Sequence, residues 1–577
     1  MQPRWVMATP ERDVVEELTR SLSVHPLLAH LLAVRDISSP EDARRFLYPS
    51  LDDLHDPRNF KQVDIAVERI FRALQTNEKV LIFGDYDADG VSSMALLAQF
   101  FKLAHFQVEP PFAPNRVSEG YGLNMNAIED IARRGITLLI TVDCGINDVD
   151  ELHRARELGV DTIIVDHHEH SGSLPPAAAI LNPKSEGCTY PFRELAAVGV
   201  TFKLIQALAA RFSASMKLTP EFQQFFDEAL GLVALGSVSD VVPLVGENRI
   251  LVYHGLKMLS RSQSPGLRAL MDVSSVPYDR IDTWHIAYQI GPRINVAGRL
   301  KEAQVAVELL TTDSTQRAWE IAKELDKENR SRQKIEKEIF ESAVEKLKDL
   351  DLNEKNIVIV LSDESWHPGV IGIVAARLVE EYHRPAILIA LEGDRGRGSA
   401  RSIPAYHIHE ALTACEDKLL TFGGHSFAAG IEILKSEIES FNIALCRDAR
   451  EKLTDEDLVP KLHIDAELNF ADITEPLLGE IRRLAPHGRG NPNPLFWARD
   501  VRLVGRPQQV GTKGNHLTLF LNQAGVALRG IAFGKGSMVK DLESRGENLE
   551  IAFRPRYSQY SGRIELDIKD IRFPAVS

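Results

Sequence analysis

The chain has 577 residues and a formal net charge of −15, with 44% hydrophobic and 26% charged residues. This composition is that of a soluble globular protein, and no run of eighteen apolar residues could span a membrane. The negative charge disfavours general attraction to nucleic acid, although a local basic channel or a bound metal can dominate the field nearby.

The N-terminal part of the chain is predicted to be helical. Residues 1–75 contain DVVEELTRSLSVHPLLAHLLAVR and SPEDARRFLYPS, which indicate a helical cap, and the first residues lack the apolar stretch of a signal peptide. The cysteines are scattered and form no CxxC pair: Cys144, Cys188, Cys415 and Cys446. We therefore expect a cytoplasmic protein without a cysteine zinc site.

From residue 76 the pattern changes to short apolar runs that alternate with helices. KVLIFG (79–84), ITLLITV (136–142) and VDTIIV (160–165) are typical of parallel strands buried on both faces. Helical segments lie between them at 91–104 and 149–159. The alternation predicts an α/β domain with a doubly wound parallel sheet over residues 76–314.

The remaining chain divides into three further segments. Residues 315–350 begin with an uninterrupted run without Gly or Pro at helical spacing and predict a long connecting helix. A second α/β domain follows at 351–455, starting near NIVIVLSD. Residues 456–577 contain short alternating segments broken by Gly, Asn and Pro, which predict a small β-barrel.

Three of the predicted strands end in acidic or imidazole side chains, and one more carboxylate follows later. Because sites in open α/β sheets form outside the carboxyl ends of the strands, we expect these groups to share one crevice. The groups are Asp85, Asp87 and Asp89 in GDYDADG, Asp143 in VDCG, Asp166, His167 and His168 in VDHH, and Asp240 in SVSDVVPL.

Carboxylates this close repel one another, so a positive group must lie among them, either Lys or Arg or a divalent metal. Oxygen donors with one or two imidazoles suit Mn²⁺, with Mg²⁺ as the second choice. Six or seven donors exceed one zinc site and fit two ions that share a bridging carboxylate. Taken singly, the same residues are ordinary helix N-caps, turn residues or core histidines, but their recurrence at successive strand ends favours a metal centre.

These motifs resemble those of a known family. DYDADG, VDCG, DHH and SVSDVVPL look like the motifs of the DHH phosphoesterase superfamily, in the same order. PHGRGNPNPLF (486–496) is similar to the start of the RecJ C-terminal OB-fold. Further segments resemble the RecJ group of single-stranded-DNA-specific exonucleases: NRVSEGYGLN (115–124), GPRINVAGRL (291–300), SWHPGVIGIVAARL (365–378), GSARS (398–402) and GGHSFAAG (423–430).

The resemblance covers the chain from about residue 75 onward. It implies an exonuclease that degrades single-stranded DNA from the 5′ end to mononucleotides, in recombination and repair, with two divalent ions. The fold it implies is a DHH domain, a connecting helix, a DHHA1 domain and an OB-fold. The metal ligands implied by motif match are Asp85, Asp87, Asp89, Asp143, His167 and Asp240.

Catalytic roles are implied for three residues of these motifs. Asp143 is the choice for the bridging carboxylate, and either Asp143 or His168 assists proton transfer. Asp166 is expected to orient His167 from outside the coordination sphere. One position departs from the family pattern, because Phe83 stands where many members carry a histidine, and Asp85 is the candidate to replace it.

Two segments are expected to hold the 5′ end of the DNA. A 5′-phosphate needs charge-assisted donors, for which Arg116, Ser399 and Arg401 are the candidates. Tyr121 is the aromatic side chain expected to stack on a base. The alternatives are an ordinary surface arginine and a core tyrosine.

Further phosphate contacts are expected from polar residues near glycines. Arg293, Asn295 and Arg299 in GPRINVAGR suit phosphate binding, with capping of the connecting helix as the alternative. In GGHSFAAG, Gly424 permits close backbone approach and His425 can donate to a phosphate oxygen. His367 is a weaker candidate, with a structural histidine as its alternative.

Rival functions remain open at this point. One is a DHH-family phosphodiesterase for oligoribonucleotides or cyclic dinucleotides, and another is a catalytically silent DHH replication scaffold. A different α/β hydrolase would need a nucleophile elbow, and the sequence has no GxSxG. The expected partner is single-stranded DNA, with a single-stranded-DNA-binding protein and a RecQ-type helicase as candidate protein partners, no membrane, and a monomeric state.

Overall fold

The computed structural model describes residues 2–114, 122–170, 172–213, 219–300, 303–348, 350, 356–558 and 561–574. The chain forms two compact units. The first comprises Met1–Pro3, His55–Val242 and His254–Pro460, and the second comprises Arg4–Leu54, Pro243–Tyr253 and Lys461–Ser577. No helix among the described residues is long and apolar enough to cross a membrane.

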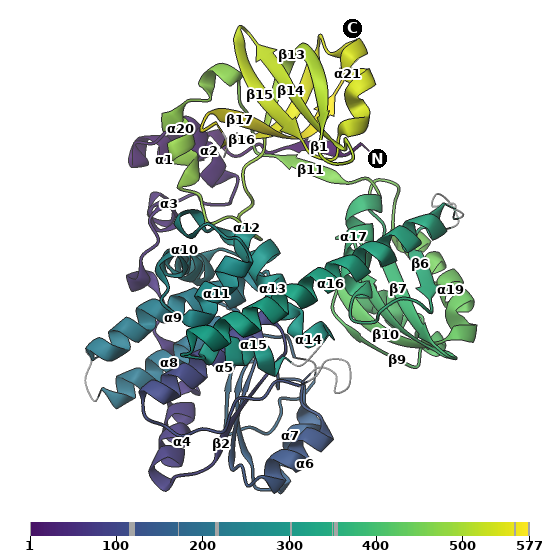
Figure 1. Cartoon of the computed structure of the whole chain (residues 1–577). Coiled ribbons are helices and arrows are strands. Elements are labelled where there is room, and N and C mark those ends of the chain that lie inside the picture. The colour runs from purple at the N-terminus through teal and green to yellow at the C-terminus, as the bar shows by residue number, and fades with distance from the viewer. Residues whose placement is uncertain are drawn as a thin grey trace. The chain divides into compact units, whose positions relative to one another are not determined.

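The first unit contains a four-stranded parallel sheet, shown in the lower part of Figure 1. Its apolar strands are buried on both faces, as the sequence predicts, apart from the partly exposed Asp161 that opens β4 and one half-buried residue in β5. Gly84, Val142 and Val165 lie side by side in the register of the sheet. The strands, in spatial order, are β2 (Val80–Gly84), β3 (Leu138–Val142), β4 (Asp161–Val165) and β5 (Ala179–Leu181).

Helices cover both faces of this sheet, which confirms the doubly wound architecture (Figure 1). One face packs on α6 (Met125–Arg133) and α7 (Val149–Glu157), where Leu81, Phe83, Leu139 and Ile164 join a common core. The helices that contact the strands from the other side are α4 (Val63–Thr76), α5 (Ala88–Leu103) and α8 (Ala197–Phe212), with α9 (Pro220–Ser239) packed on α5 and α8.

A series of shorter helices follows and leads to the connecting helix. The long helix α16 (Thr315–Leu347) begins after Ser314, whose side chain accepts a hydrogen bond from the backbone of Arg317. It packs on α11, α13 and α15 and also on α17 (Ile371–Tyr382). The shorter elements are α10 (Gly246–Arg261), α11 (Pro265–Val273), α12 (Thr283–His285), the π-helical turn η4 (Ile286–Ile290), α13 (Gly291–Asn295), α14 (Ala297–Leu300) and α15 (Gln304–Thr311).

The second α/β part of this unit is a five-stranded mixed sheet. Alternate residues of β7 enter two different cores, with Leu388 on the side of α16 and α17 and Ile387 on the side of α18 (Ile408–Thr413) and α19 (Ile438–Lys452). The strands, in spatial order, are β6 (Ile359–Asp363), β7 (Ala386–Glu392), β8 (Arg395–Arg401), β10 (Ala428–Leu434) and β9 (Thr421–Gly424).

The second unit contains the predicted C-terminal barrel. The sheet closes because β13 pairs with both β14 and β16. β12 (Ala466–Glu467) adds to β13, and α20 (Glu475–Arg482) and α21 (Val539–Arg545) complete this part. The barrel strands are β13 (Phe496–Val510), β14 (His516–Gln523), β15 (Val526–Ala532), β17 (Ile564–Arg572) and β16 (Leu549–Tyr557).

The N-terminal helices share their hydrophobic core with this barrel. β1 (Arg4–Met7) pairs in parallel with β11 (Lys461–Ile464). Leu18, Leu28 and Leu32 belong to the same core as residues of the barrel. The sequence predicts the helices but gives no sign of this partner more than 400 residues away. The helices are α1 (Arg12–Leu22), α2 (Pro26–Ala33) and α3 (Pro40–Leu47).

A buried arginine ties three segments of the second unit together. The guanidinium of Arg249 donates to the carbonyls of Phe46, Arg483, Leu484, Ala485 and Pro486 at 2.9–3.3 Å. It lies 3.7 Å from the centre of the Phe46 ring. Burial, together with the charge of Arg35, lowers the pKa of Arg249 to about 9, so it is still a cation at neutral pH.

Candidate metal centre and adjoining cavity

The register of the parallel sheet brings the predicted acidic groups together. Because β2, β3 and β4 end level with one another, Asp85, Asp143 and Asp166 leave the sheet at the same edge. The backbone amide of Asp143 donates to Val165 at 3.0 Å. Asp143 then takes a left-handed backbone conformation with φ 62°, a region that Asp tolerates better than most residues.

The helix that follows β2 supplies two more carboxylates. Asp87 caps α5 and accepts from the amides of Asp89 and Gly90 at 2.8 and 3.2 Å. A Cβ at Gly90 would lie 2.4 Å from the carbonyl oxygen of Asp85, so only glycine permits this tight turn. Asp89 accepts from the amides of Ala197 and Val198 at the start of α8, at 2.8 and 2.9 Å.

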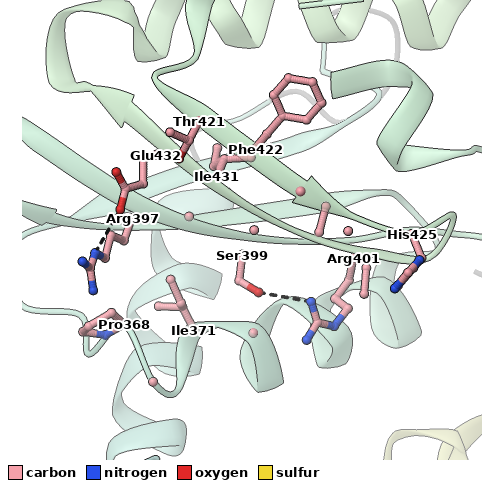
Figure 2. A pocket seen from close by; sticks show the side chains of 18 of the residues that line it. Pro368, Ile371, Arg397, Ser399, Arg401, Thr421, Phe422, His425, Ile431 and Glu432 are labelled. Carbon is pink, nitrogen blue, oxygen red and sulfur yellow. Dashed lines mark hydrogen bonds and ion pairs between the residues drawn. The ribbon is translucent and has the colours of Figure 1, made fainter. Parts of the chain in front are cut away.

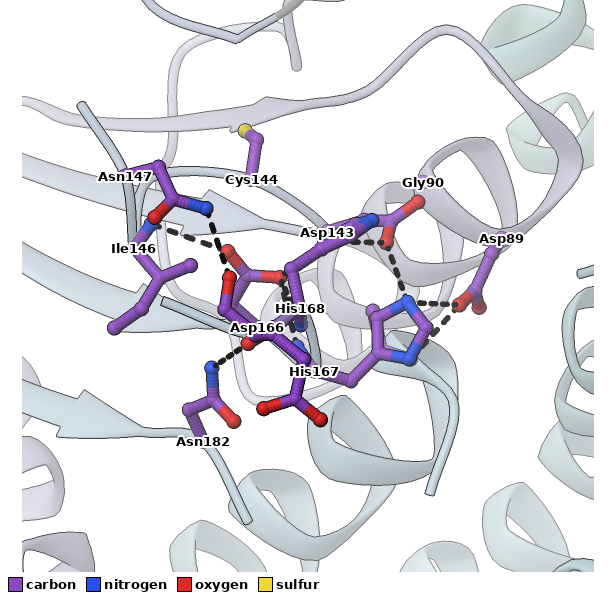
Figure 3. A network of polar contacts seen from close by, with 12 residues as sticks. Asp89, Gly90, Asp143, Cys144, Ile146, Asn147, Asp166, His167, His168 and Asn182 are labelled. Carbon is purple, nitrogen blue, oxygen red and sulfur yellow. Dashed lines mark hydrogen bonds and ion pairs between the residues drawn. The ribbon is translucent and has the colours of Figure 1, made fainter. Parts of the chain in front are cut away.

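The predicted ligands form three overlapping groups, in each of which the ligand atoms lie within 4.8 Å of one another. Nε2 of His167 lies 3.3 Å from Oδ1 of Asp143 (Figure 3). The same nitrogen lies 3.6 Å from Oδ2 of Asp240. Asp143 and His167 each belong to two groups, which is the arrangement expected of a position between two ions. The groups are Asp85, Asp87 and Asp143; Asp143, His167 and His168; and Asp89, His167 and Asp240.

The carboxylates at this site are held where their negative charge is costly. Burial, followed by the charge of Asp87, raises the pKa of Asp89 to about 7. Burial and the neighbouring carboxylates also raise the pKa values of Asp143 and Asp240 well above the usual range. Burial, with the charge of His168, lowers the pKa of His167 to about 3, which leaves its imidazole neutral and able to bind a metal. A cluster rich in carboxylate oxygens with one neutral imidazole fits Mn²⁺ or Mg²⁺.

Asp166 orients a different histidine from the one that the sequence predicts. Its Oδ1 accepts from the ring Nδ1 of His168 at 2.7 Å and from the backbone amides of His167 and His168 (Figure 3). Asp166 therefore reaches His167 through the main chain and holds the ring of His168. Burial opposes the charge on both groups, but their mutual attraction raises the pKa of His168 to about 9 and holds that of Asp166 below its usual range.

Phe83 lies apart from the metal cluster. Its ring is fully buried on the side of α6 and α7 and lies 5.7 Å from the ring of Phe112. Asp85, directly after this strand, belongs to the cluster.

A cavity of about 820 Å³ adjoins the metal cluster within the first unit. His168 belongs both to the metal cluster and to the lining of the cavity. Arg299 of α14 also lines the cavity. The other wall is the sheet face of β8, β9 and β10, where Ser399, Arg401 and His425, directly after β9, line the cavity (Figure 2). Gly424 at the end of β9 lines it as well. Nη1 of Arg401 donates to Oγ of Ser399 at 3.1 Å, which places both on one face of β8. The structure thus brings these five predicted DNA-binding residues together.

Other predicted DNA-binding residues lie elsewhere among the described residues. Arg293 pairs with Asp326 of α16 at 2.8 Å and donates to the carbonyl of Gln289. Asn295 accepts from the amide of Ala88 at 2.7 Å, which fixes the loop before α5. Nδ1 of His367 accepts from the amide of Gly369 at 3.0 Å in a turn. The glycine-bounded segment 291–300 is mostly helical, with α13 and α14 in it. Arg293 contacts Asp326 in the middle of α16 and does not cap that helix.

Two predicted residues, Arg116 and Tyr121, lie outside the described residues. Among the lining residues that the sequence did not predict, Arg397 is a further cation on the sheet wall. Arg397 lies on the same face of β8 as Ser399 and Arg401 and pairs with Glu432 at 3.4 Å (Figure 2). The alternation in RGRGSAR, with small residues between the polar ones, was the signal for it.

Glycines keep the sheet face of the cavity bare. Gly430 of β10 lies beside Ser399 in the register, and Gly423 of β9 lies beside Gly430. A Cβ at either glycine would have no other atom within 4 Å. The cavity is therefore open above this part of the sheet because side chains are absent from it.

Comparisons with known proteins agree with this layout. Family models match residues 79–237 (DHH family, N-terminal domain), 353–451 (DHHA1 domain) and 464–570 (RecJ OB domain). The chain is 36% identical over 571 residues to the single-stranded-DNA-specific exonuclease RecJ of Bacillus subtilis, covering 98% of this chain and 70% of that protein. It is 34% identical over 559 residues to RecJ of Haemophilus influenzae, covering 95% and 96%.

Solved structures show the same relationship. The crystal structure of RecJ in complex with Mn²⁺ from Thermus thermophilus matches with a TM-score of 0.82 and 30% identity, over 99% of this chain and 80% of that one. A second crystal structure of that protein, in complex with Mg²⁺, matches with a TM-score of 0.78. Together with the metal cluster and the adjoining cavity, these matches lead to one conclusion: the chain belongs to the RecJ family.

Proposed function

We propose that the chain is a metal-dependent exonuclease specific for single-stranded DNA, which releases mononucleotides from the 5′ end in recombination and repair. The observation that carries this proposal is the position of His168, which belongs both to the metal cluster and to the cavity lined by Ser399, Arg401 and His425. A strand end bound by these three residues has its first phosphodiester bond near the metal cluster. Family membership supports the same activity.

We propose two divalent ions as cofactors, with Mn²⁺ preferred and Mg²⁺ accepted. Asp85, Asp87 and Asp143 would hold one ion, and Asp89, His167 and Asp240 the other, with Asp143 shared. When bound, such a pair supplies activation of water and stabilisation of the leaving oxygen in phosphodiester hydrolysis. The solved Thermus relatives contain Mn²⁺ or Mg²⁺, which supports this choice.

The protein's own residues position the substrate in this scheme. Asp166 holds the ring of His168 so that its other nitrogen is directed away from the carboxylate, where it can donate to a phosphate oxygen or move a proton. Ser399 and Arg401 offer a hydroxyl and a guanidinium to the 5′-terminal phosphate. Asn295 supports the carboxylates from behind by fixing the start of α5.

The broader assignments are proposals too. We propose the domain bounds 1–75, 76–314, 315–350, 351–455 and 456–577, with the barrel as a second platform for single-stranded DNA. We also propose a cytoplasmic monomer that works with a single-stranded-DNA-binding protein and a RecQ-type helicase. Sedimentation and pull-down with purified partners test these points.

The decisive experiment is digestion of single-stranded DNA labelled at either end, with Mn²⁺ or Mg²⁺. We expect the 5′ label to appear at once as a mononucleotide, and a 5′-tailed duplex to lose its tail and stall near the junction. Asp143→Ala should bind the strand without cleaving it, whereas Asp161→Asn, on the same sheet but at its opposite edge, should cleave normally. Release from the 3′ end, equal digestion of blunt duplex, or turnover restricted to dinucleotides would overturn the proposal.

A further inference from the structure

Two large aromatic side chains are exposed together on the helical segment that leads to the metal cluster. Trp284 of α12 is 53% exposed and Tyr288 of the π-helical turn η4 is 67% exposed. Their ring centres are 5.8 Å apart and the ring planes differ by 34°. Neighbouring exposed rings offer faces on which bases can stack, and π-helical turns recur at functional sites.

A stripe of exposed cations runs along the connecting helix. Its members alternate at spacings of four and three residues, so they share one face of α16: Lys323, Lys327, Arg330, Lys334 and Lys337. Near the middle of this cationic stripe, a surface hollow of about 540 Å³ is lined by Asp326, Lys327, Arg330, Ser331 and Lys334.

Carboxylates oppose only part of this charge. Asp326 pairs with Arg330 at 2.9 Å but is shared with Arg293. Lys334 lies 3.8 Å from Glu338, and Lys337 lies 3.9 Å from Glu341, both exposed pairs of the kind that contributes little. Lys323 lies over the ring of Trp319. The stripe spans about 21 Å at roughly 1.5 Å per residue.

Arg293 connects the aromatic pair to the stripe. Its guanidinium donates to the carbonyl of Gln289, next to Tyr288, at 2.5 Å. It also pairs with Asp326 at 2.8 Å, and the other oxygen of Asp326 pairs with Arg330. The aromatic pair and the stripe are therefore attached to one another through one partly buried ion-pair network.

The same helical segment continues to the metal centre. A Cβ at Gly291 would lie 2.6 Å from Oγ of Ser239, the residue before the ligand Asp240. Asn295, four residues later, accepts from the backbone of Ala88 between Asp87 and Asp89. None of Trp284, Tyr288 and the stripe lines the cavity that is proposed to receive the 5′ end.

We infer that Trp284, Tyr288 and the cationic stripe of α16 form a track for single-stranded DNA outside the cavity, on the 3′ side of the bond that is cut. Bases stack on the two rings while phosphates follow the lysines, the combination by which proteins hold single strands without reading their sequence. The inference rests on the proposed function, because the 5′ end must lie in the cavity for the 3′ part to reach this surface. Arg293 then aligns the two halves of the track and does not itself bind phosphate.

Removal of the rings tests the stacking half of the track. For Trp284→Ala/Tyr288→Ala, we expect kcat/KM on a long single strand to fall by at least about thirtyfold, through KM, because stacking on two bases is lost. Hydrolysis of a dinucleotide, too short to reach the rings, should not change. Trp284→Phe/Tyr288→Phe should restore most of the loss, and Ile443→Ala, which removes an equally exposed side chain on α19, should have no effect.

Removal of the charges tests the phosphate half. For Lys327→Gln/Lys334→Gln/Lys337→Gln, the plot of log binding constant against log salt should become shallower by about 2, since each lost phosphate contact contributes roughly 0.7 for single strands. Lys61→Gln/Arg156→Gln/Lys257→Gln carries the same charge change elsewhere and should keep the wild-type slope. Binding can be measured in an Asp143→Ala background to prevent cleavage.

The outcomes separate this inference from the proposed function. If the wild-type protein cuts long strands but both sets of variants match it in KM and salt slope, the track is refuted and the exonuclease assignment stands. If the wild-type protein cuts no single-stranded DNA with either metal, the proposed function fails first. An equal loss on the dinucleotide and on the long strand would mean damage to the active site and would also refute the track.

Discussion

Nδ1 of His168 lies 2.7 Å from Oδ1 of Asp166, and this contact fixes the one imidazole that belongs both to the metal cluster and to the cavity. The same carboxylate oxygen accepts the amides of His167 and His168, and Oδ2 accepts the amide of Ile146. Asp166 thus holds the loops after β3 and β4 in place together.

Replacement of Asp166 should impair the site without dismantling the sheet. For Asp166→Asn we expect metal affinity and kcat to fall by about 10- to 100-fold, the usual effect of losing such a supporting carboxylate. Mn²⁺ titration by calorimetry and single-turnover cleavage measure the two effects. Asp161→Asn, at the opposite end of the same strand, is the matched control and should leave both unchanged. Wild-type metal affinity in Asp166→Asn would contradict the role given to this residue.

Metal binding should stabilise the first unit by relieving repulsion among Asp89, Asp143 and Asp240. We expect Mn²⁺ at a hundred times its Kd to add about 2.7 kcal/mol to the free energy of unfolding. Without metal, Asp143→Asn/Asp240→Asn should be more stable than the wild type, because it removes two carboxylates whose burial is costly. Differential scanning calorimetry measures the stability of the wild type and of the variant, each with chelator and with Mn²⁺. If Mn²⁺ stabilised the variant as much as the wild type, the assignment of these residues to the metal centre would be wrong.

The second unit should lose stability in mild acid because of His487. Burial, and then the charges of Arg35, Arg249 and Arg554, lower its pKa in the folded protein to about 3 from 6.5. Between pH 6.5 and pH 3 the imidazole is therefore protonated in the unfolded chain but not in the folded chain. The free energy of unfolding is highest above pH 6.5 and falls as the pH drops toward 3. Between pH 7 and pH 5 the expected loss is about 2 kcal/mol.

The comparison that tests this prediction is urea unfolding of wild type, His487→Gln and His463→Gln at both pH values. His463 is exposed on β11, so its replacement should keep the wild-type pH dependence. His487→Gln should reduce the difference between pH 7 and pH 5. An unchanged difference would mean that other groups cause the acid sensitivity.

Loss of Arg249 should destabilise the second unit more than any exposed substitution. Arg249→Ala removes a buried cation that donates to five carbonyls, of which those of Leu484 and Pro486 keep a bond from Asn491, and we expect a cost of about 3–5 kcal/mol. Arg249→Lys keeps the positive charge but not the planar set of guanidinium donors, so its stability should lie between those of the wild type and Arg249→Ala. Arg261→Ala, exposed on the same helix, is the control and should change stability by less than about 0.5 kcal/mol. Thermal unfolding followed by circular dichroism measures all three.

Sequence reasoning succeeded where local pattern and topology agree. The apolar runs before Asp85, Asp143 and Asp166 mark parallel strands, and parallel strands end at one edge of a sheet, so their convergence followed from the sequence. Ser399 and Arg401, predicted together as candidates for the 5′-phosphate, likewise lie side by side on one face of β8.

It failed where a partner lies far away along the chain. The cation Arg293 looked like a phosphate ligand because nothing near it in sequence marks Asp326 as its counterion. The choice between His167 and His168 as the partner of Asp166 depends on side-chain rotation, which a dipeptide of two histidines does not encode. Residues 4–54 gave no sign that they share a core with the barrel, because that core is assembled from both ends of the chain.

The pairing of β1 with β11 has a consequence for synthesis on the ribosome. Arg4–Met7 emerges more than 450 residues before its partner Lys461–Ile464. At translation rates of about 5–20 residues per second, the leading segment waits roughly 20 to 90 seconds, with the apolar faces of its helices uncovered. During that interval chaperones can bind the exposed apolar faces of these helices. The first unit can fold while the second unit still lacks its last strands.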